Sequence, residues 1–207
     1  MSCSFLRKRF CGDTAGATAV EFALVSMLMM GLLLGAIDMA RFAWEFNAQK
    51  AAARAGARFA AVHPPVPTGL SSFHPVTTCT SLGLGGGEAL PSGTVPDFTC
   101  TSTAGTASCT SSGTDPCSIG AAASNANFNA IVDYMKRYNP RISSSNVSIK
   151  YQERGLGVAG NPFGVDVSPL ITVSLRNVTF RPIALRIFGV TLSLPSVSTT
   201  MTGEDMS

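Results

Sequence analysis

A long apolar run near the N-terminus constrains this chain more than any other feature. Residues 17–37 read ATAVEFALVSMLMMGLLLGAI, with a single charged residue among them. About 21 helical residues extend roughly 30 Å, which matches the hydrocarbon core of a bilayer. The sequence therefore predicts one membrane-spanning helix that ends at about residue 37, and it contains no second stretch of this kind.

The single charge in the run, Glu21, lies five residues after Gly16. A carboxylate inside hydrocarbon costs at least about 2.5 kcal/mol, so its presence requires a specific role. A peptidase cut after Gly16 would supply that role, because Ala17 would become the new N-terminus and Glu21 the fifth residue of the mature chain. We therefore predict that residues 1–16 are a cleaved basic leader. This layout resembles that of type IV pilins and pseudopilins, and the resemblance implies that Glu21 meets the terminal amine of a neighbouring chain.

Two other interpretations of this region remain open. A secretory signal has the same basic start, but its apolar region is shorter and a carboxylate fits poorly inside it. An uncleaved signal anchor needs only the apolar run. The N-terminal residue of the membrane-resident protein distinguishes these possibilities.

The flanking charges predict the orientation of the helix. Arg7, Lys8 and Arg9 precede the run, whereas Asp38, Arg41 and Glu45 form a mixed flank after it. The positive-inside rule then places the N-terminus in the cytoplasm and the C-terminal domain across the membrane. Loss of residues 1–16 removes three basic residues and one acidic residue, which lowers the net charge from +3 to +1. A nearly neutral domain gives no electrostatic reason to expect nucleic acid as a partner.

The helix is predicted to continue to residue 62. Residues 38–62 are rich in helix formers and contain no proline until His63-Pro64-Pro65 ends the pattern. One face carries apolar or small residues at helical spacing, and we expect an ordinary buried face there: Ala40, Trp44, Ala48, Ala51, Ala55 and Phe59. Gly31-xxx-Gly35 also has the spacing of a helix–helix contact within a membrane.

These blocks carry a family resemblance. GATAVEFAL, the apolar run, GAIDMAR and AARAGARFA occur in the order and spacing of TadE-like proteins, so that residues 5–62 resemble this family closely. The resemblance implies a minor pseudopilin of the tight-adherence (Flp, type IVc) pilus system, which acts in surface adhesion and biofilm formation. It also implies processing by a prepilin peptidase between Gly16 and Ala17, with Glu21 as the pilin glutamate. Implied partners are other pilins, inner-membrane pilus assembly proteins and the lipid bilayer. Many relatives have a proline where this chain has Ser26-Met27, so no proline kink is carried over.

Residues 64–118 differ sharply in composition, being rich in Ser, Thr, Gly and Pro, and we expect a loop there. Four cysteines lie in this segment: Cys79, Cys100, Cys109 and Cys117. An even number of cysteines in an exported loop predicts disulfides, and all three pairings remain open. Zinc is the alternative, with His63 and His74 nearby, but no CxxC or HxxxH spacing supports it, so we expect no metal. Cys3 and Cys11 are expected to be free thiols in the leader.

Residues 119–207 are predicted to form a helix followed by antiparallel strands. Ser118 is a plausible N-cap, and Asn139-Pro140 ends the helix. Alternating residues then predict strands within 146–154, 168–180 and 189–203. RPIALRIFG, between the last two, is expected to pack under the long helix, with the membrane surface or a partner as alternatives. The predicted fold is α+β: a pilin-like long N-terminal transmembrane helix with a small exported head of one helix and an antiparallel sheet.

A catalytic constellation is not visible in the sequence. The acidic residues of the head are scattered, neither histidine has a nucleophile motif beside it, and no G-x-S-x-G occurs. We therefore expect no enzyme and no cofactor. The leading hypothesis is a structural and assembly protein of the bacterial inner membrane, single-pass, whose C-terminal domain is periplasmic or part of a surface pilus. The alternative is an uncleaved single-pass anchor that carries a periplasmic binding module.

Overall fold

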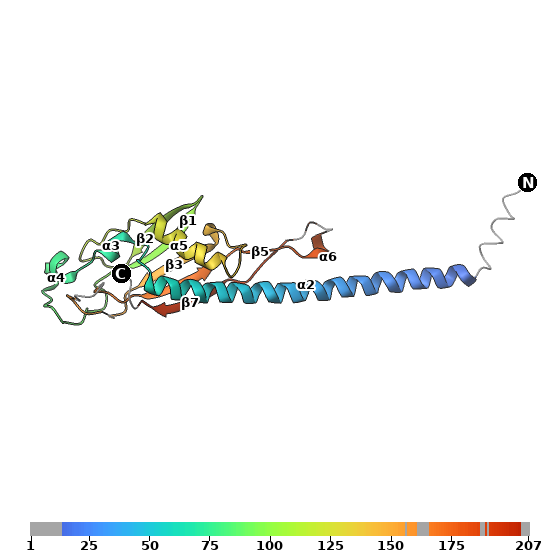
Figure 1. Ribbon diagram of the computed structural model, residues 1–207, viewed down its shortest axis with the longest axis horizontal. Coiled ribbons are helices and arrows are strands. Elements are labelled where there is room, and N and C mark those ends of the chain that lie inside the picture. Colours follow the sequence, from blue (N-terminus) through green and yellow to red (C-terminus); the bar gives the residue numbers. More distant parts are fainter. Residues whose placement is uncertain (1–13, 156, 161–165, 187–188, 190, 204–207) are drawn as a thin grey trace, which may run out of the picture. The chain divides into compact units, whose positions relative to one another are not determined.

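The computed structural model describes residues 14–155, 157–160, 166–186, 189 and 191–203 (Figure 1). A helix of 49 residues, α2 (Thr14–Val62), comes first, and an antiparallel sheet with a shorter helix follows it. This confirms the predicted α+β class with a long N-terminal apolar helix. The chain forms two compact units: residues up to Ala43 together with Arg181–Leu192, and Trp44–Phe180 together with Ser193–Ser207. We describe each by itself.

The second unit is built on a five-stranded antiparallel sheet of order β2-β1-β3-β4-β7. Its strands are β1 (Asp97–Thr103), β2 (Thr106–Ser112), β3 (Val147–Gln152), β4 (Leu170–Leu175) and β7 (Val197–Thr202). Two of these lie within residues 64–118, which the sequence analysis predicted as a loop. The hairpin turn is Ala104-Gly105, and both residues have positive φ, 50° and 85°, as the tight turn of a two-residue hairpin requires.

The two faces of the sheet differ in chemistry because side chains alternate along each strand. One face is apolar and fully buried, with Phe98, Cys100, Ile149, Tyr151, Ile171 and Val173 at its centre. The other carries hydroxyl groups in register, one row being Ser108, Thr101, Ser148, Ser174 and Ser198. The sheet therefore has one face for a core and one for solvent, as open antiparallel sheets do.

Helix α5 (Asn125–Lys136) supplies Phe128, Ile131, Val132 and Met135 to the same core as the sheet. Its N-cap is Ser124, whose hydroxyl accepts from Asn127 N at 3.3 Å. The predicted cap, Ser118, is wrong: Ser118 has φ +52°, and the residues after it run beside the 66–68 segment instead of starting a helix. Thr68 N donates to Ala122 O at 2.9 Å and Ser124 N donates to Val66 O at 2.8 Å, so tertiary backbone pairing overrides the helix propensity of 119–123.

Short elements connect the larger ones. They are α3 (Thr68–Ser71), α4 (Pro75–Thr78), η1 (Thr80–Leu82) and η2 (Ser144–Asn146), and a two-stranded sheet pairs β5 (Thr179–Phe180) with β6 (Leu192–Ser193). The predicted strands 168–180 and 189–203 are thus each divided into two. In the first unit, the N-terminal part of α2 lies with the segment Arg181–Leu192, which contains α6 (Ile183–Arg186).

Candidate functional site

The predicted processing residues lie at the start of the apolar helix. Gly16, Ala17 and Glu21 are all in α2 and all exposed, and no atom comes within 4 Å of a Cβ placed on Gly16. Ala17 and Glu21 are four residues apart, so they lie on the same side of the helix, one turn apart. The leader itself, including Cys3 and Cys11, lies outside the described residues apart from Thr14–Gly16.

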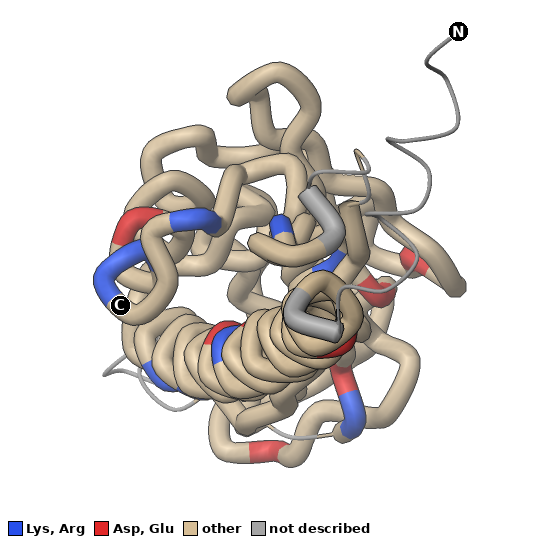
Figure 2. The backbone as a smooth tube through the Cα atoms, turned by 90° about the vertical axis from the view of Figure 1, so that its right-hand side faces the viewer, with Lys and Arg blue, Asp and Glu red and all other residues tan. Residues whose placement is uncertain are grey.

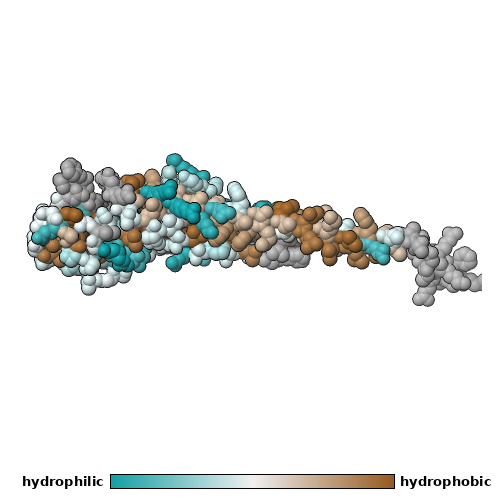
Figure 3. Space-filling model, turned by 90° about the horizontal axis from the view of Figure 1, so that it is seen from below, coloured by the Kyte–Doolittle hydropathy of each residue, from teal (hydrophilic) through white to brown (hydrophobic). Residues whose placement is uncertain are grey.

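The apolar run that follows is open to its surroundings. Among the described residues, α2 is the one helix long and apolar enough to cross a membrane, and none of its most apolar stretch is buried. Its hydrophobic side chains gather along the N-terminal half of the helix in Figure 3. Gly31 and Gly35 lie one turn apart within it, and a Cβ added at either position would meet no atom within 4 Å. The two glycines thus leave a shallow, unfilled strip on the helix.

A carboxylate marks the end of the run. Asp38 is the first charged residue after Ile37, and its side chain is largely buried. Its two oxygens accept hydrogen bonds from the backbone N–H groups of Ile183 at 2.7 Å and Ala184 at 2.8 Å, and Arg41 Nη1 lies 3.4 Å from it. The Ile183 N–H lowers the pKa of Asp38 below its ordinary value of 3.8, burial opposes this shift, and Ala184 and Arg41 reinforce it. Asp38 is therefore a carboxylate at neutral pH, held to the first turn of α6.

The C-terminal half of α2 packs on the head through a stripe that the sequence analysis did not identify. Its buried residues are Glu45, Gln49, Ala52, Ala53, Ala55, Gly56, Ala57, Ala60 and Ala61. Of the predicted face, Ala55 is buried and Phe59 is half-buried, whereas Trp44 is 73% exposed. A Cβ at Gly56 would lie 2.7 Å from both Cγ and Sδ of Met135, so α5 approaches the helix closely there. Because alanines occur on every side of this helix, the sequence does not show which side is buried. Gly56, with Ala52 and Ala60 one turn away on either side, is the pattern that could have predicted the buried stripe.

Polar contacts fix the position of the same stripe. Arg141 Nη1 lies 2.6 Å from Glu45 Oε1, and Phe59 stacks on Tyr134 with ring centroids 4.7 Å apart. Charged positions are sparse along the described backbone (Figure 2). Through Arg141, Glu45 of the mixed flank joins the helix to the head within the second unit.

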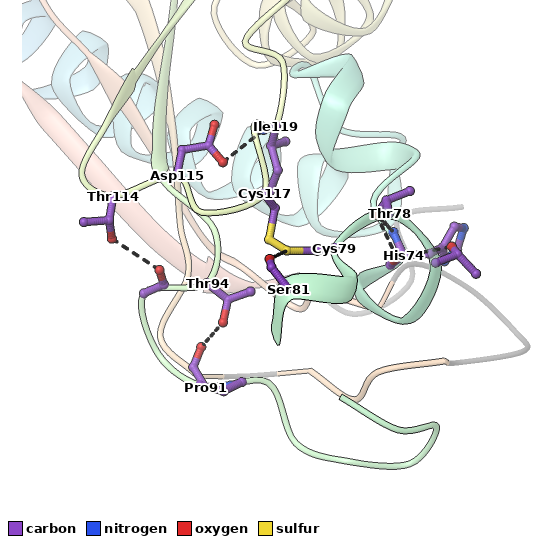
Figure 4. The surroundings of a disulfide bond; sticks show 12 residues. His74, Thr78, Cys79, Ser81, Pro91, Thr94, Thr114, Asp115, Cys117 and Ile119 are labelled. Carbon is purple, nitrogen blue, oxygen red and sulfur yellow. Dashed lines mark hydrogen bonds between the residues drawn. A yellow bond between two sulfur atoms is a disulfide. The ribbon is translucent and has the colours of Figure 1, made fainter. Parts of the chain in front are cut away.

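The four cysteines of the head form two disulfides, Cys79–Cys117 and Cys100–Cys109. This is one of the three pairings that the sequence left open. Cys100 and Cys109 face each other directly across β1 and β2, while Cys79–Cys117 joins the turn after α4 to the segment before α5. Around the Cys79–Cys117 bond, Asp115 Oδ1 accepts a hydrogen bond from Ile119 N at 3.0 Å, and Ser81 Oγ lies 3.5 Å from Cys79 Sγ (Figure 4).

The histidines near these cysteines have other contacts. His63 Nδ1 lies 3.1 Å from Pro64 O, and His74 Nδ1 lies 3.4 Å from Asp166 Oδ2. Within the part of the chain that the structure describes, no group of three His, Cys, Asp or Glu is placed to hold a metal ion.

A polar cleft of about 400 Å³ lies where β1 begins and β2 and β3 end, lined by Asp97, Ser112, Glu153 and Arg154 among others. Its carboxylates are engaged within the protein. Glu153 accepts from the backbone N–H groups of Gly93, at 2.7 Å, and Gly155, while Asp97 contacts Gln152, Lys150 and Arg154. These contacts give both carboxylates a structural role at the sheet end.

Comparison with known proteins adds one finding. Residues 16–58 match the family described as TadE-like protein, and the match begins at Gly16. No curated protein and no solved structure matches the chain. The matched residues cover the apolar helix, the Asp38 boundary and the Gly56 contact, but none of the sheet. The resemblance predicted from the sequence blocks is thus confirmed for residues 16–58 of the long helix, which match the TadE-like family.

Proposed function

We propose that this protein is a minor pseudopilin of a tight-adherence pilus, needed for assembly of the filament and through it for adhesion and biofilm formation. The observation that carries the proposal is that the TadE-like match begins at Gly16, in the first turn of an exposed apolar helix, with Glu21 in the next turns. The proposed role is structural and involves no catalysis or cofactor. Prepilin peptidase, other pilins and inner-membrane assembly proteins are the proposed partners.

The apolar helix supports the proposed location. Side chains such as Phe22 (75% exposed) and Met27 (78% exposed) would be costly in water, so the helix requires lipid or other helices around it. We propose that it anchors the protein in the inner membrane with its N-terminus in the cytoplasm. During assembly the same surface would exchange lipid for the helices of neighbouring subunits, with Gly31 and Gly35 at a close contact.

The experiment that tests this proposal is analysis of the N-terminus of protein purified from membranes of its own host. We expect the chain to begin at Ala17. Gly16→Val should leave the basic leader attached, whereas Gly31→Val, a matched change within the apolar run, should leave cleavage intact. Wild-type protein that retains residues 1–16 would remove the pseudopilin proposal.

The alternative function is an uncleaved single-pass anchor whose head binds a periplasmic ligand. The polar cleft beside Asp97 and Glu153 is the observation that favours it. Retention of the leader would support this alternative, and cleavage at Ala17 would support the pseudopilin. A ligand of the cleft should then be lost in Arg154→Gln, since Arg154 is half-exposed at the rim and extends from the end of β3.

A further inference from the structure

The segment that contains α6 is held at the end of the apolar run. Ile183 N and Ala184 N donate to Asp38 at 2.7 and 2.8 Å, and Asp38 directly follows Ile37. A helix rises about 1.5 Å per residue, so the backbone of Asp38 lies only about 1.5 Å along the axis beyond Ile37, where the apolar run ends. The first turn of α6 is therefore fixed at the depth where a membrane-spanning helix would leave the hydrocarbon.

The pattern of exposure on α2 supports this position. Leu34, Gly35, Asp38 and Phe42 form one stripe of reduced exposure, whereas Leu33, Ile37 and Met39 beside them are 54%, 49% and 70% exposed. In this compact unit, the described residues other than α2 all belong to Arg181–Leu192. The stripe is most deeply buried at Asp38, where Ile183 and Ala184 bind the carboxylate.

The chemistry of the segment suits a membrane surface. Residues 181–192 contain two arginines, no acidic residue and several large apolar residues. Arg181 is exposed and Ile183 is 49% exposed, so both side chains have surface available for contact with lipid. Basic residues next to apolar ones at the edge of the hydrocarbon bind anionic lipid surfaces, each basic residue contributing about 1 kcal/mol.

We propose that Arg181 and Ile183, held beside Asp38, form a lipid-binding surface at the leaflet from which α2 emerges. Ile183 inserts at the level of the headgroups, and Arg181 binds the phosphate of an anionic phospholipid. Asp38 is a positioning residue: its carboxylate takes its hydrogen bonds from α6 in place of water and keeps the segment at this depth. The inference rests on the proposed anchoring of α2 but does not depend on cleavage at Gly16 or on a pilus.

The test uses the full chain in vesicles at a low protein-to-lipid ratio, which keeps copies apart. Trp44 is the only tryptophan, so Trp44→Phe gives a background without one. Three tryptophan substitutions are then compared in that background: Leu28→Trp within the run, Ile183→Trp in the segment, and Tyr138→Trp on the head. Phospholipids brominated near the headgroup or near the chain end quench a tryptophan at the corresponding depth.

We expect Ile183→Trp to be quenched by lipids brominated near the headgroup, and Leu28→Trp by lipids brominated near the chain end. Tyr138→Trp, at a position that is 48% exposed on the head, should not be quenched. Quenching of Ile183→Trp should be stronger in vesicles that contain phosphatidylglycerol than in phosphatidylcholine alone. In vesicles that contain phosphatidylglycerol, Arg181→Gln should lower the ratio of bound to released segment by up to about fivefold, and the quenching should fall accordingly.

The failures of the two proposals are distinguishable. If Leu28→Trp is not quenched, the proposed anchoring is wrong. If Leu28→Trp is quenched but Ile183→Trp is not, the anchoring stands and the proposed lipid contact of Arg181 and Ile183 is overturned. Asp38→Asn provides the test of positioning: quenching of Ile183→Trp should fall while that of Leu28→Trp is unchanged. Equal quenching with and without Asp38 would remove its positioning role.

Discussion

Arg141 Nη1 lies 2.6 Å from Glu45 Oε1, and the two residues are 96 positions apart in the chain. Glu45 is on the long helix and its side chain is only 6% exposed, whereas Arg141 follows α5 and is 48% exposed. Among the described residues, the second carboxylate oxygen of Glu45 and the amide oxygen of Gln49, one turn later, have no hydrogen-bond partner. The Glu45–Arg141 pair therefore supplies the hydrogen bond of this buried carboxylate and links the helix to the head within the second unit.

Loss of Arg141 should destabilise the head because it leaves a buried carboxylate without its partner. We expect Arg141→Met to lower the free energy of unfolding by about 1–3 kcal/mol, less than for a fully buried pair because Arg141 is half-exposed. The free energy of unfolding of the variant and of wild type is measured by urea unfolding in detergent. The matched control is Lys136→Met, which breaks the exposed Lys136–Asp133 pair and should cost under about 0.5 kcal/mol. Equal effects from the two variants would contradict the assigned role.

The close approach of α2 and α5 predicts a difference between two glycines of the same helix. Gly56→Ala should be destabilising by about 1–3 kcal/mol, since the new methyl group would lie 2.7 Å from the buried Met135 side chain. Gly31→Ala should leave head stability unchanged because nothing lies within 4 Å of it. Thermal unfolding compares the two. If the clash is the cause, Met135→Ala should destabilise the Gly56→Ala protein less than it destabilises wild type, since the shortened side chain makes room for the new methyl group.

The features that sequence reasoning could predict are those fixed by local pattern. The apolar run, the helix formers after it and His63-Pro64 define α2, which ends at Val62. The hairpin of β1 and β2 was missed because its buried face contributes only Phe98, Cys100 and Ala107 amid serines and threonines. Alternating threonines on both sides of Ala104-Gly105 were the available signal.

The remaining features depend on contacts between distant segments. The disulfide pairing follows from the hairpin register, which sets Cys100 opposite Cys109 and leaves Cys79 for Cys117. The link between Asp38 and α6 joins residues 145 positions apart, and the pattern of charges around Asp38 gives no indication of it. Glu45 and Gln49 would be assigned to a solvated face by polarity alone, and only the tertiary partner Arg141 explains why Glu45 is buried.

The two disulfides should contribute unequally to stability. A bond restricts the unfolded chain more when it closes a longer loop, and the sequence separations are 38 for Cys79–Cys117 and 9 for Cys100–Cys109. We expect the Cys79→Ser, Cys117→Ser double variant to lose roughly 4 kcal/mol and the Cys100→Ser, Cys109→Ser variant roughly 3 kcal/mol. Peptide mapping without reduction checks the pairing first. A Cys79–Cys100 or Cys79–Cys109 peptide would contradict the register of β1 and β2.

Alkaline pH should destabilise the head through Tyr151. Burial raises the pKa of this phenol above its ordinary value of 10.0, and the hydrogen bond from Val66 N only partly opposes the shift. The unfolded state therefore loses the phenol proton first, so stability from Tyr151 is complete below about pH 10 and is lost as pH rises further. Tyr151→Phe should flatten this decline. It should also cost about 1–3 kcal/mol at pH 7, because Val66 N–H loses its acceptor.

Tyr138→Phe is the matched control for the alkaline experiment. The pKa of Tyr138 is also raised, first by the side-chain hydrogen bond with Tyr134, but the residue is 48% exposed. We therefore expect a smaller change in the pH profile and little change in stability at pH 7. A profile equally affected by both substitutions would mean that Tyr151 is not the group responsible.

Glu21 gives the sharpest test of assembly. A carboxylate in the apolar run is costly alone and is compensated by an amine from a neighbouring chain. Glu21→Ala should therefore leave insertion into the membrane unchanged or improved, and cleavage after Gly16 should persist. It should nevertheless impair association with pilus components, because the pairing with the Ala17 amine of a neighbour is removed.

The experiment expresses Glu21→Ala in a host that lacks the native copy. Membrane level, mature size, cross-linking to pilus components and surface filaments are then compared with wild type. Ser26→Ala is the control, since Ser26 Oγ donates only to Ala23 O within the same helix, at 3.0 Å, and its loss should change none of the four. Normal cross-links and filaments in Glu21→Ala would make Glu21 a tolerated polar residue. Loss of the variant from the membrane would instead assign Glu21 to stability, because a residue that only pairs between chains is not required for a single chain to insert.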